Sequence, residues 1–212
     1  MTDKLRDPVS ALTHLFSAAV ALIGVIVLLA LSDKTTAWVL SLSVYGASLV
    51  LLFLASGTYH SVRSTPRTIE IFRKLDHSAI YLLIAGSYTP FCVNAFSGFW
   101  RWGLLAIVWS LAFTGIIIKV FTMHAPRWVT AGVYVAMGWL SVLAAREMLA
   151  ALSPSTLFWL FAGGVIYTLG AVVYATKKLE LIPGVLGFHE VWHIFVILGA
   201  AAHFVAIATL IA

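Results

Sequence analysis

Two histidines on one apolar stretch have the spacing of residues that act together. His189 and His193 are four residues apart, which places both imidazoles on the same face of a helix. Two imidazoles arranged in this way can reach one metal ion. Ser56 and His60 have the same spacing in an earlier apolar stretch, and Asp76 stands at the start of a third. These five residues can form one site only if the elements that carry them bring them together.

The composition indicates which elements these are. Of the 212 residues, 62% are hydrophobic and 10% are charged, whereas a soluble domain is about half apolar and about a quarter charged. This composition excludes a water-soluble enzyme, a disordered chain and a coiled coil. At about 20 residues for each span, the chain has room for at most about eight to ten spans. We therefore expect an all-α, polytopic membrane protein.

Seven apolar runs have the length of a membrane span, and only short connectors separate them, the longest near residues 61–76. The runs predict a seven-transmembrane helix bundle that forms a single domain over residues 1–212. The first run is long enough to span, and no small-residue cleavage site follows it, so we expect no cleaved signal peptide. The spans are expected at about residues 11–31, 38–60, 77–97, 100–121, 127–150, 155–176 and 186–211.

The basic residues of the connectors predict the orientation. Ten lie on one side of the predicted spans and three, Lys34, Arg101 and Arg146, lie on the other. Cytoplasmic loops carry the excess of Lys and Arg, so the N-terminus is expected in the cytoplasm and the C-terminus outside. This bias explains the net charge of +5 without a nucleic-acid partner. The ten are Lys4, Arg6, Arg63, Arg67, Arg73, Lys74, Lys119, Arg127, Lys177 and Lys178.

With this orientation, the candidate residues fall at one depth in the membrane. His60 lies at the cytoplasmic end of the second span, while Asp76, His189 and His193 lie at the cytoplasmic beginnings of the third and seventh. Three His ligands with a water in the fourth position are a frequent catalytic zinc arrangement. Asp76 could hold that water or accept its proton, and Ser56 could add a hydrogen bond. The single Cys92 allows neither an internal disulfide nor a paired-cysteine metal site.

Other interpretations of these residues remain open. Asp76 could cap a helix or pair with Lys74, and Glu190 could be an exposed residue of a first helical turn. Residues 189–193 also match H-E-x-x-H, the zincin metalloprotease motif, in which Glu190 would be the general base. The metzincin form of that motif needs a third His where this chain has Gly199, so we rank it lower. Packing or interfacial roles are expected for the remaining histidines, His14, His77, His124 and His203.

A resemblance to a known family emerges from these motifs in their order along the chain. Nearly the whole chain resembles the hemolysin III group of the progestin and adiponectin receptor (PAQR) family. The resemblance implies a seven-helix bundle with the N-terminus inside. It also implies a zinc ion held by His60, His189 and His193, with Asp76 and Ser56 beside the metal-bound water. The matching segments are 7–14 (DPVSALTH), Ser56-x-x-x-His60, 74–81 (KLDHSAIY), 86–90 (GSYTP) and His189-x-x-x-His193.

One motif departs from the family pattern. The adiponectin-receptor branch has a Glu and an Asn in its first-span motif, where this chain has Asp7 and Ser10 as the nearest counterparts. We therefore assign no role to the first-span motif.

The resemblance implies a function connected with membrane lipids. Eukaryotic members of the family resemble receptors with lipid-amide hydrolase activity on ceramides, and the zinc arrangement is similar to that of alkaline ceramidases. Bacterial members carry an old name for hemolysis and are associated with membrane lipid and energy homeostasis. We expect membrane lipids as partners, a multi-pass location in the bacterial inner (plasma) membrane, and zinc-dependent hydrolysis of a lipid amide or ester at the cytoplasmic leaflet. The alternative is a membrane-state sensor or receptor with a structural zinc and an unidentified protein partner. A pore-forming hemolysin and a transporter rank lower.

Overall fold

Helices joined by short connectors make up the fold. The computed structural model describes residues 5–123 and 125–211, so the predictions made for Lys4, His124 and the C-terminal residue lie outside the described residues. A short 3-10 segment, η2 (Trp139–Ala144), directly joins α5 to α6. The helices are α1 (Pro8–Leu31), α2 (Thr36–Ser61), α3 (Pro66–Asn94), α4 (Gly98–Phe121), α5 (Arg127–Gly138), α6 (Ala145–Ala151), α7 (Pro154–Thr176) and α8 (Phe188–Ile211).

Local sequence signals explain where several helices begin. Pro8, Pro66 and Pro154 occupy the first helical position of α1, α3 and α7, where a missing N–H costs nothing. The side chains of Thr65 and Ser153 accept hydrogen bonds from backbone N–H groups in the first turn of α3 and α7. These caps allow a helix to start before its apolar segment does.

The helix α3 begins well before the third predicted span. We expected a connector near residues 61–76 and a span from residue 77, whereas the helix already begins at Pro66. The capped start and an ion pair between Lys74 and Glu70, 3.0 Å apart and one helical turn from each other, stabilise these polar first turns. A helix requires satisfied backbone hydrogen bonds and not an apolar surface, so α3 extends beyond the apolar run from which its span was predicted.

Six helices of the described residues are long and apolar enough to cross a membrane. They are α1, α2, α4, the continuous segment Arg127–Ala151, α7 and α8. The third predicted span corresponds to α3, which is not among the six because it carries more polar residues. α3 packs against α2 and α4 and also contacts α5 and α8, so much of its surface faces other helices. The membrane crossing by α3 and the cytoplasmic position of the N-terminus stay predictions.

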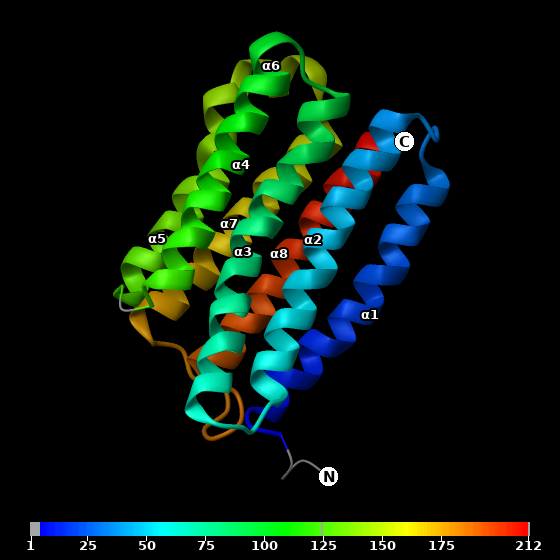
Figure 1. Cartoon of the computed structure of the whole chain (residues 1–212). Helices are drawn as coiled ribbons and strands as arrows, with labels where there is room; N and C mark the ends of the chain where they lie inside the picture. Colours follow the sequence, from blue (N-terminus) through cyan, green and yellow to red (C-terminus); the bar gives the residue numbers. More distant parts are fainter. Residues whose placement is uncertain (1–4, 124, 212) are drawn as a thin grey trace.

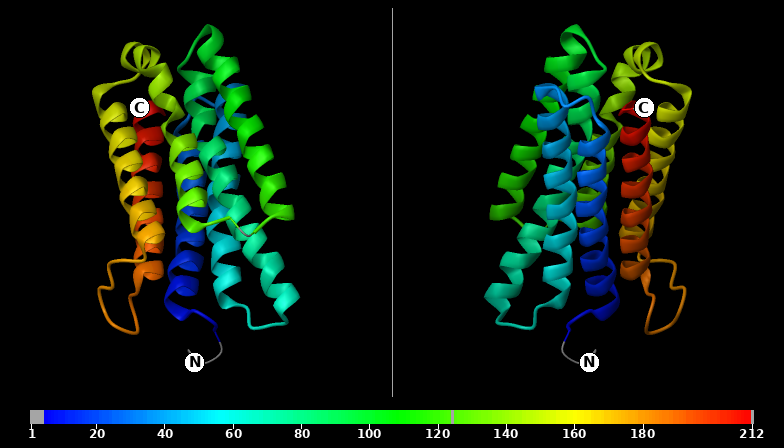
Figure 2. Two further views of the ribbon diagram at one scale, coloured as in Figure 1. Left: turned by 90° about the vertical axis from the view of Figure 1, so that its left-hand side faces the viewer. Right: turned by 90° about the vertical axis from the view of Figure 1, so that its right-hand side faces the viewer.

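The helices run side by side as an elongated bundle (Figure 1). α1 packs against α2 and α8, and α7 packs against α8 and α5. The start of α1, the connector between α2 and α3, and the loop before α8 all lie at one end of the bundle (Figure 2). We call this the site end. α8 ends at the opposite end (Figure 1).

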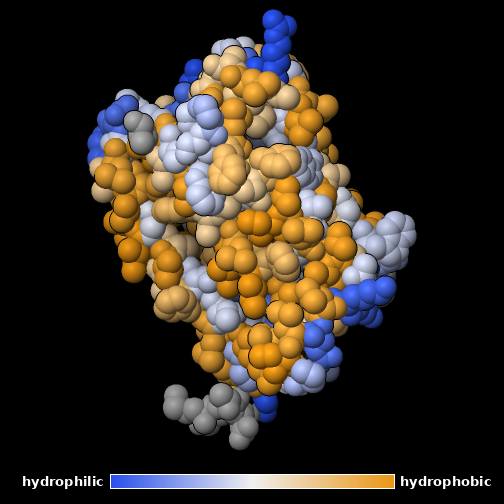
Figure 3. Space-filling view, turned by 180° about the vertical axis from the view of Figure 1, so that it is seen from behind, coloured by the Kyte–Doolittle hydropathy of each residue, from blue (hydrophilic) through white to orange (hydrophobic). Residues whose placement is uncertain are grey.

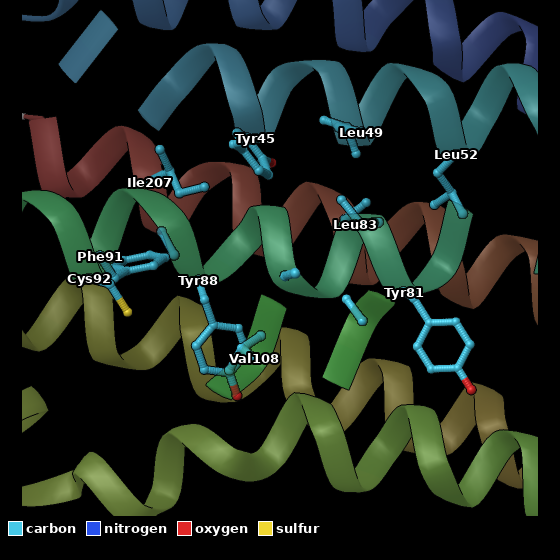
Figure 4. Close-up of a cluster of buried hydrophobic side chains, with 14 of the residues drawn as sticks. Tyr45, Leu49, Leu52, Tyr81, Leu83, Tyr88, Phe91, Cys92, Val108 and Ile207 are labelled. Atoms are coloured by element: carbon cyan, nitrogen blue, oxygen red, sulfur yellow. The ribbon is translucent and has the colours of Figure 1, made fainter. Parts of the chain in front are cut away.

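The interior and the surface of the bundle are both rich in apolar side chains. Tyr45, Leu42 and Val108 are fully buried, and Figure 4 shows part of this core. Large apolar side chains are also exposed, including Phe16 on α1 and Phe121 on α4. Hydrophobic residues cover most of the face in Figure 3, and hydrophilic ones lie mainly toward its two ends. Such a surface matches a lipid environment and not water.

Candidate metal centre

Three histidines from two helices converge at the site end. His60 is the penultimate residue of α2, and His189 and His193 lie on one face of the first turns of α8. Nε2 of His189 is 3.3 Å from Nε2 of His60 and 3.2 Å from Nε2 of His193. One ligand atom from each residue lies within 4.8 Å of the other two. The structure therefore brings together the three predicted ligands, close enough to hold a metal ion.

The spacing of these nitrogens fits a tetrahedral zinc site. At Zn–N distances of about 2.0–2.1 Å, two nitrogens at a tetrahedral angle stand about 3.3 Å apart. The two Nε2–Nε2 distances of 3.2 and 3.3 Å agree with this value. His60 and His193 are 2% and 3% exposed, so protein surrounds these two imidazoles. The residues present thus fit a small divalent ion with imidazole ligands.

Asp7 sets the tautomer of His60, a role that the sequence did not predict. Nδ1 of His60 lies 2.8 Å from Oδ2 of Asp7, and a carboxylate can only accept, so Nδ1 carries the proton. Nε2 of a neutral His60 then carries a free lone pair, and this nitrogen faces the other two histidines. A carboxylate on the second nitrogen is the usual support of a metal-ligating histidine. The available signal was an acidic residue directly before the first span, at the depth of the candidate ligands.

Further contacts hold Asp7 in place. Its backbone N–H donates to the carbonyl of His60 at 2.9 Å, and Nε of Arg6 donates to its carboxylate at 3.1 Å. Burial raises the pKa of the Asp7 carboxyl, but the hydrogen bonds from His60 and Arg6 and the electrostatic attraction of both residues together outweigh burial and leave the pKa below its ordinary value. Asp7 therefore remains an anion facing His60.

His14 stacks on one of the three histidines without joining them. The centroid of its ring lies 4.0 Å from that of His193, with 29° between the two ring planes, and the ring also packs edge-on against Phe53. His14 is 2% exposed, and within the described residues neither ring nitrogen has a hydrogen-bond partner. His14 thus packs directly against His193, which is one of the candidate ligands.

Ser56 and Asp76 lie beside two of the three histidines. Both line a cavity of about 40 Å³ that His189 and His193 also line. This volume is enough for a water molecule, which needs roughly 10–15 Å³. Oδ2 of Asp76 lies 3.5 Å from Nδ1 of His77, and Ser56 is buried. The cavity thus offers a carboxylate and a hydroxyl next to the candidate metal ligands.

Glu190 contacts a different helix. Its carboxylate accepts a hydrogen bond of 3.4 Å from the hydroxyl of Ser10 on α1, and it is not a member of the histidine group.

His203 lies far along α8, where its Nε2 meets the carbonyl of Leu160 at 3.3 Å. Nδ1 of His77 meets the carbonyl of Arg73 at 2.9 Å. The packing roles expected for His77 and His203 agree with these contacts.

The fold and the site define a multi-pass helical membrane protein with a three-histidine group at one end of its bundle. Comparison with known proteins identifies the family. Residues 2–204 match the family described as Haemolysin-III related, and the chain belongs to this family. The hemolysin III and PAQR resemblance inferred from the motifs is thereby confirmed.

Named relatives cover nearly the whole chain. Hemolysin-3 of Bacillus cereus is 38% identical in an alignment 209 residues long that covers 96% of this chain and 91% of the relative. The Hemolysin-3 homolog of Bacillus subtilis (strain 168) is 36% identical over 92% of this chain and 89% of its own length. The human Monocyte to macrophage differentiation factor is 34% identical over 92% of this chain and 80% of its own length. The apolar helices and the family establish a multi-pass membrane protein, and the bacterial relatives indicate the inner membrane.

Proposed function

We propose that this protein binds zinc through His60, His189 and His193 and hydrolyses an amide or ester bond of a membrane lipid. The observation that carries the proposal is the set of Nε2 separations of 3.2 and 3.3 Å next to a cavity that holds a carboxylate. When bound, the zinc ion supplies a Lewis acid and lowers the pKa of a water molecule. The protein's own residues supply the remaining steps.

Asp76 is the proposed proton carrier. It lines the same cavity as His189 and His193, within reach of a water placed there. As the water oxygen adds to the lipid carbonyl carbon, Asp76 accepts a proton from that water. It then returns the proton to the leaving nitrogen or oxygen as the carbonyl–heteroatom bond breaks, so that a fatty acid and an amine or alcohol are released. Ser56 donates a hydrogen bond that orients the water.

The apolar part of the cavity wall supports a lipid substrate. Leu52, Ile80, Trp192 and Val196 line the cavity together with the polar residues. An acyl chain that enters from the bilayer would contact these side chains, while its carbonyl faces the polar group. This proposal includes a position at the cytoplasmic leaflet, which follows from the predicted orientation, and a contribution to membrane lipid homeostasis.

A structural role for the ion is the second candidate. α2 and α8 pack mainly against other helices and not against each other, so an ion held by His60 and His193 would tie two otherwise separate elements. Such a site would restrain the site end of a membrane sensor or receptor. The contact of Glu190 with Ser10 gives no support to a zincin role for Glu190.

Metal analysis combined with lipid turnover separates these candidates. We expect His60→Ala and His193→Ala to lose zinc, and Asp76→Asn to retain zinc but lose at least about a hundredfold in turnover. Turnover is measured with membrane lipid extracts and the purified protein, and folding is checked by thermal unfolding in detergent. Folded, zinc-loaded wild type that turns over no acyl lipid would exclude the hydrolase and favour the structural ion. Wild type without zinc would exclude both.

A further inference from the structure

A second, larger cavity opens beside the metal centre. It measures about 260 Å³, close to the lower end of the roughly 300–1,000 Å³ of small-ligand pockets. Asp76, His77 and His189 line both cavities, so the larger one leads to the histidine group. The connector between α4 and α5 forms part of its wall through Met123 and Ala125.

Three cations from three helices line this larger cavity, which we call the basic cavity. Arg73 comes from α3, Lys119 from α4 and Arg127 from α5. Asp76 is the carboxylate among the lining residues, which leaves an excess of two positive charges. No ion pair between described residues includes any of the three cations, and Asp76 pairs with His77.

The contacts of the three cations leave donors available. Nε of Arg73 is buried, and within the described ranges it has no hydrogen-bond partner. Lys119 is 5% exposed, and among the described residues its three donors make one hydrogen bond, to the hydroxyl of Thr130 at 2.9 Å. The guanidinium carbon of Arg127 lies 5.4 Å from the ring centroid of Tyr174 and 5.3 Å from that of Phe188, and an aromatic ring does not neutralise its charge. Lys119 is the buried one of the three, whereas Arg73 is half-buried and Arg127 is exposed. A buried cation without a counter-charge is costly, and an anion in the cavity would offset that cost.

We infer that the basic cavity binds a phosphate monoester, and that this group is the headgroup of the membrane lipid on which the proposed hydrolysis acts. A phosphate monoester carries about −1.5 to −2 charges and three acceptor oxygens, which matches the excess charge and the free donors. The two arginines suit paired contacts to phosphate oxygens, and Lys119 supplies a point charge. A carboxylate would neutralise only half of the excess.

The arrangement of the two cavities favours a lipid over free phosphate. The cavity beside the histidines carries apolar side chains such as Leu52 and Val196 next to its polar ones. The carbons beside an acyl linkage can contact these side chains, whereas free phosphate has no apolar part. Trp128 and Phe121 are exposed near the basic cavity, at the ends of the helices that carry Arg127 and Lys119. Exposed aromatic residues at helix ends are typical of the level of lipid headgroups. A headgroup phosphate in the basic cavity would leave the acyl linkage near the metal centre.

The test measures binding with a lipid that cannot be hydrolysed. The full-length, metal-loaded protein in detergent micelles is titrated with a diether phosphatidic acid and with the diether glycerol of the same chains. We expect the phosphate-bearing lipid to bind at least about tenfold more tightly, and Arg127→Gln to abolish most of this preference. Lys178→Gln is the matched control, because Lys178 is exposed near the same end but does not line the cavity. Equal loss in both variants, or equal binding of both lipids, would overturn the inference.

Two further arms complete the experiment. Lys119→Met keeps the length of a buried side chain while removing its charge, and we expect it to weaken the same preference. If neither Arg127→Gln nor Lys119→Met weakens it, the basic cavity is not the site. Inorganic phosphate that binds as tightly as the lipid would overturn the lipid assignment. The ether bonds resist hydrolysis, so binding is measured apart from turnover. Phosphate-dependent binding without turnover of the ester lipid would contradict the proposed hydrolysis and leave the phosphate site in place. Turnover without phosphate-dependent binding would contradict the phosphate site and leave the proposed hydrolysis in place.

Discussion

Nδ1 of His60 lies 2.8 Å from the carboxylate of Asp7, and this contact connects the residue before the first helix to the end of the second. It ties the metal centre to the start of α1, because the backbone N–H of Asp7 also donates to the carbonyl of His60. The proton on Nδ1 leaves Nε2 of His60 directed at the two histidines of α8. The first-span motif, to which the sequence alone assigned no role, therefore supports the ligand set.

Replacing Asp7 tests this support. We expect Asp7→Asn to lower the zinc affinity by about 10–100-fold, because loss of a carboxylate partner weakens a ligating histidine by this amount. Zinc affinity is measured by competition with a chelator, and Glu180→Gln is the control, since this exposed carboxylate contacts the backbone of Gly184 and not the site. Unchanged affinity in Asp7→Asn would show that the hydrogen bond does not serve the metal.

The ring of His14 is expected to act by packing. His14→Phe keeps a flat ring against His193 and should retain zinc binding within about threefold, whereas His14→Ala removes the stacked ring. We expect His14→Ala to destabilise the fold by about 2–4 kcal/mol through the cavity that it leaves. Thermal unfolding and zinc content are measured for both variants. Loss of zinc in a folded His14→Phe would instead make His14 a fourth ligand.

Close approach of α7 and α8 depends on a glycine. A Cβ built at Gly163 would overlap the ring of His203, whereas a Cβ at Gly132 meets nothing within 4 Å. We expect Gly163→Ala to destabilise the protein by about 1–3 kcal/mol, and Gly132→Ala to be neutral or slightly stabilising. At this chain length each kcal/mol shifts Tm by roughly 2–4 °C, which a melting curve in detergent resolves. Equal Tm values for the two variants would contradict this packing.

The hydroxyl of Tyr88 forms hydrogen bonds with backbone groups of the segment between α5 and α6. Its single O–H proton is shared between the carbonyls of Gly138 and Met137, at 2.6 and 3.0 Å, and its oxygen accepts from the N–H of Ser141 at 2.9 Å. Tyr88→Phe should therefore cost about 1–3 kcal/mol, because buried backbone groups lose their partner. Tyr45→Phe is the control, since in the described part of the chain its buried hydroxyl has no hydrogen-bond partner. A similar Tm for both variants would show that other groups satisfy this segment.

The sequence by itself was sufficient for the class of protein and for the three metal-ligand candidates. Long apolar runs require spanning helices, and a spacing of four residues puts His189 and His193 on one face whatever else the chain does. The charge bias of the connectors placed His60 at the same depth, and the structure brings its Nε2 to 3.3 Å from His189. These features are local, or depend only on helix direction, so they can be read without a fold.

Only the tertiary structure decided the surroundings of those ligands. Asp7 and His60 are 53 residues apart, and no periodicity indicates that a residue before the first helix pairs with one at the end of the second. The basic cavity likewise collects Arg73, Lys119 and Arg127 from three helices. In the sequence these three only contribute to a charge bias. Their convergence depends on which helices pack together and how each is rotated about its axis, and the long-range contacts between helices determine both.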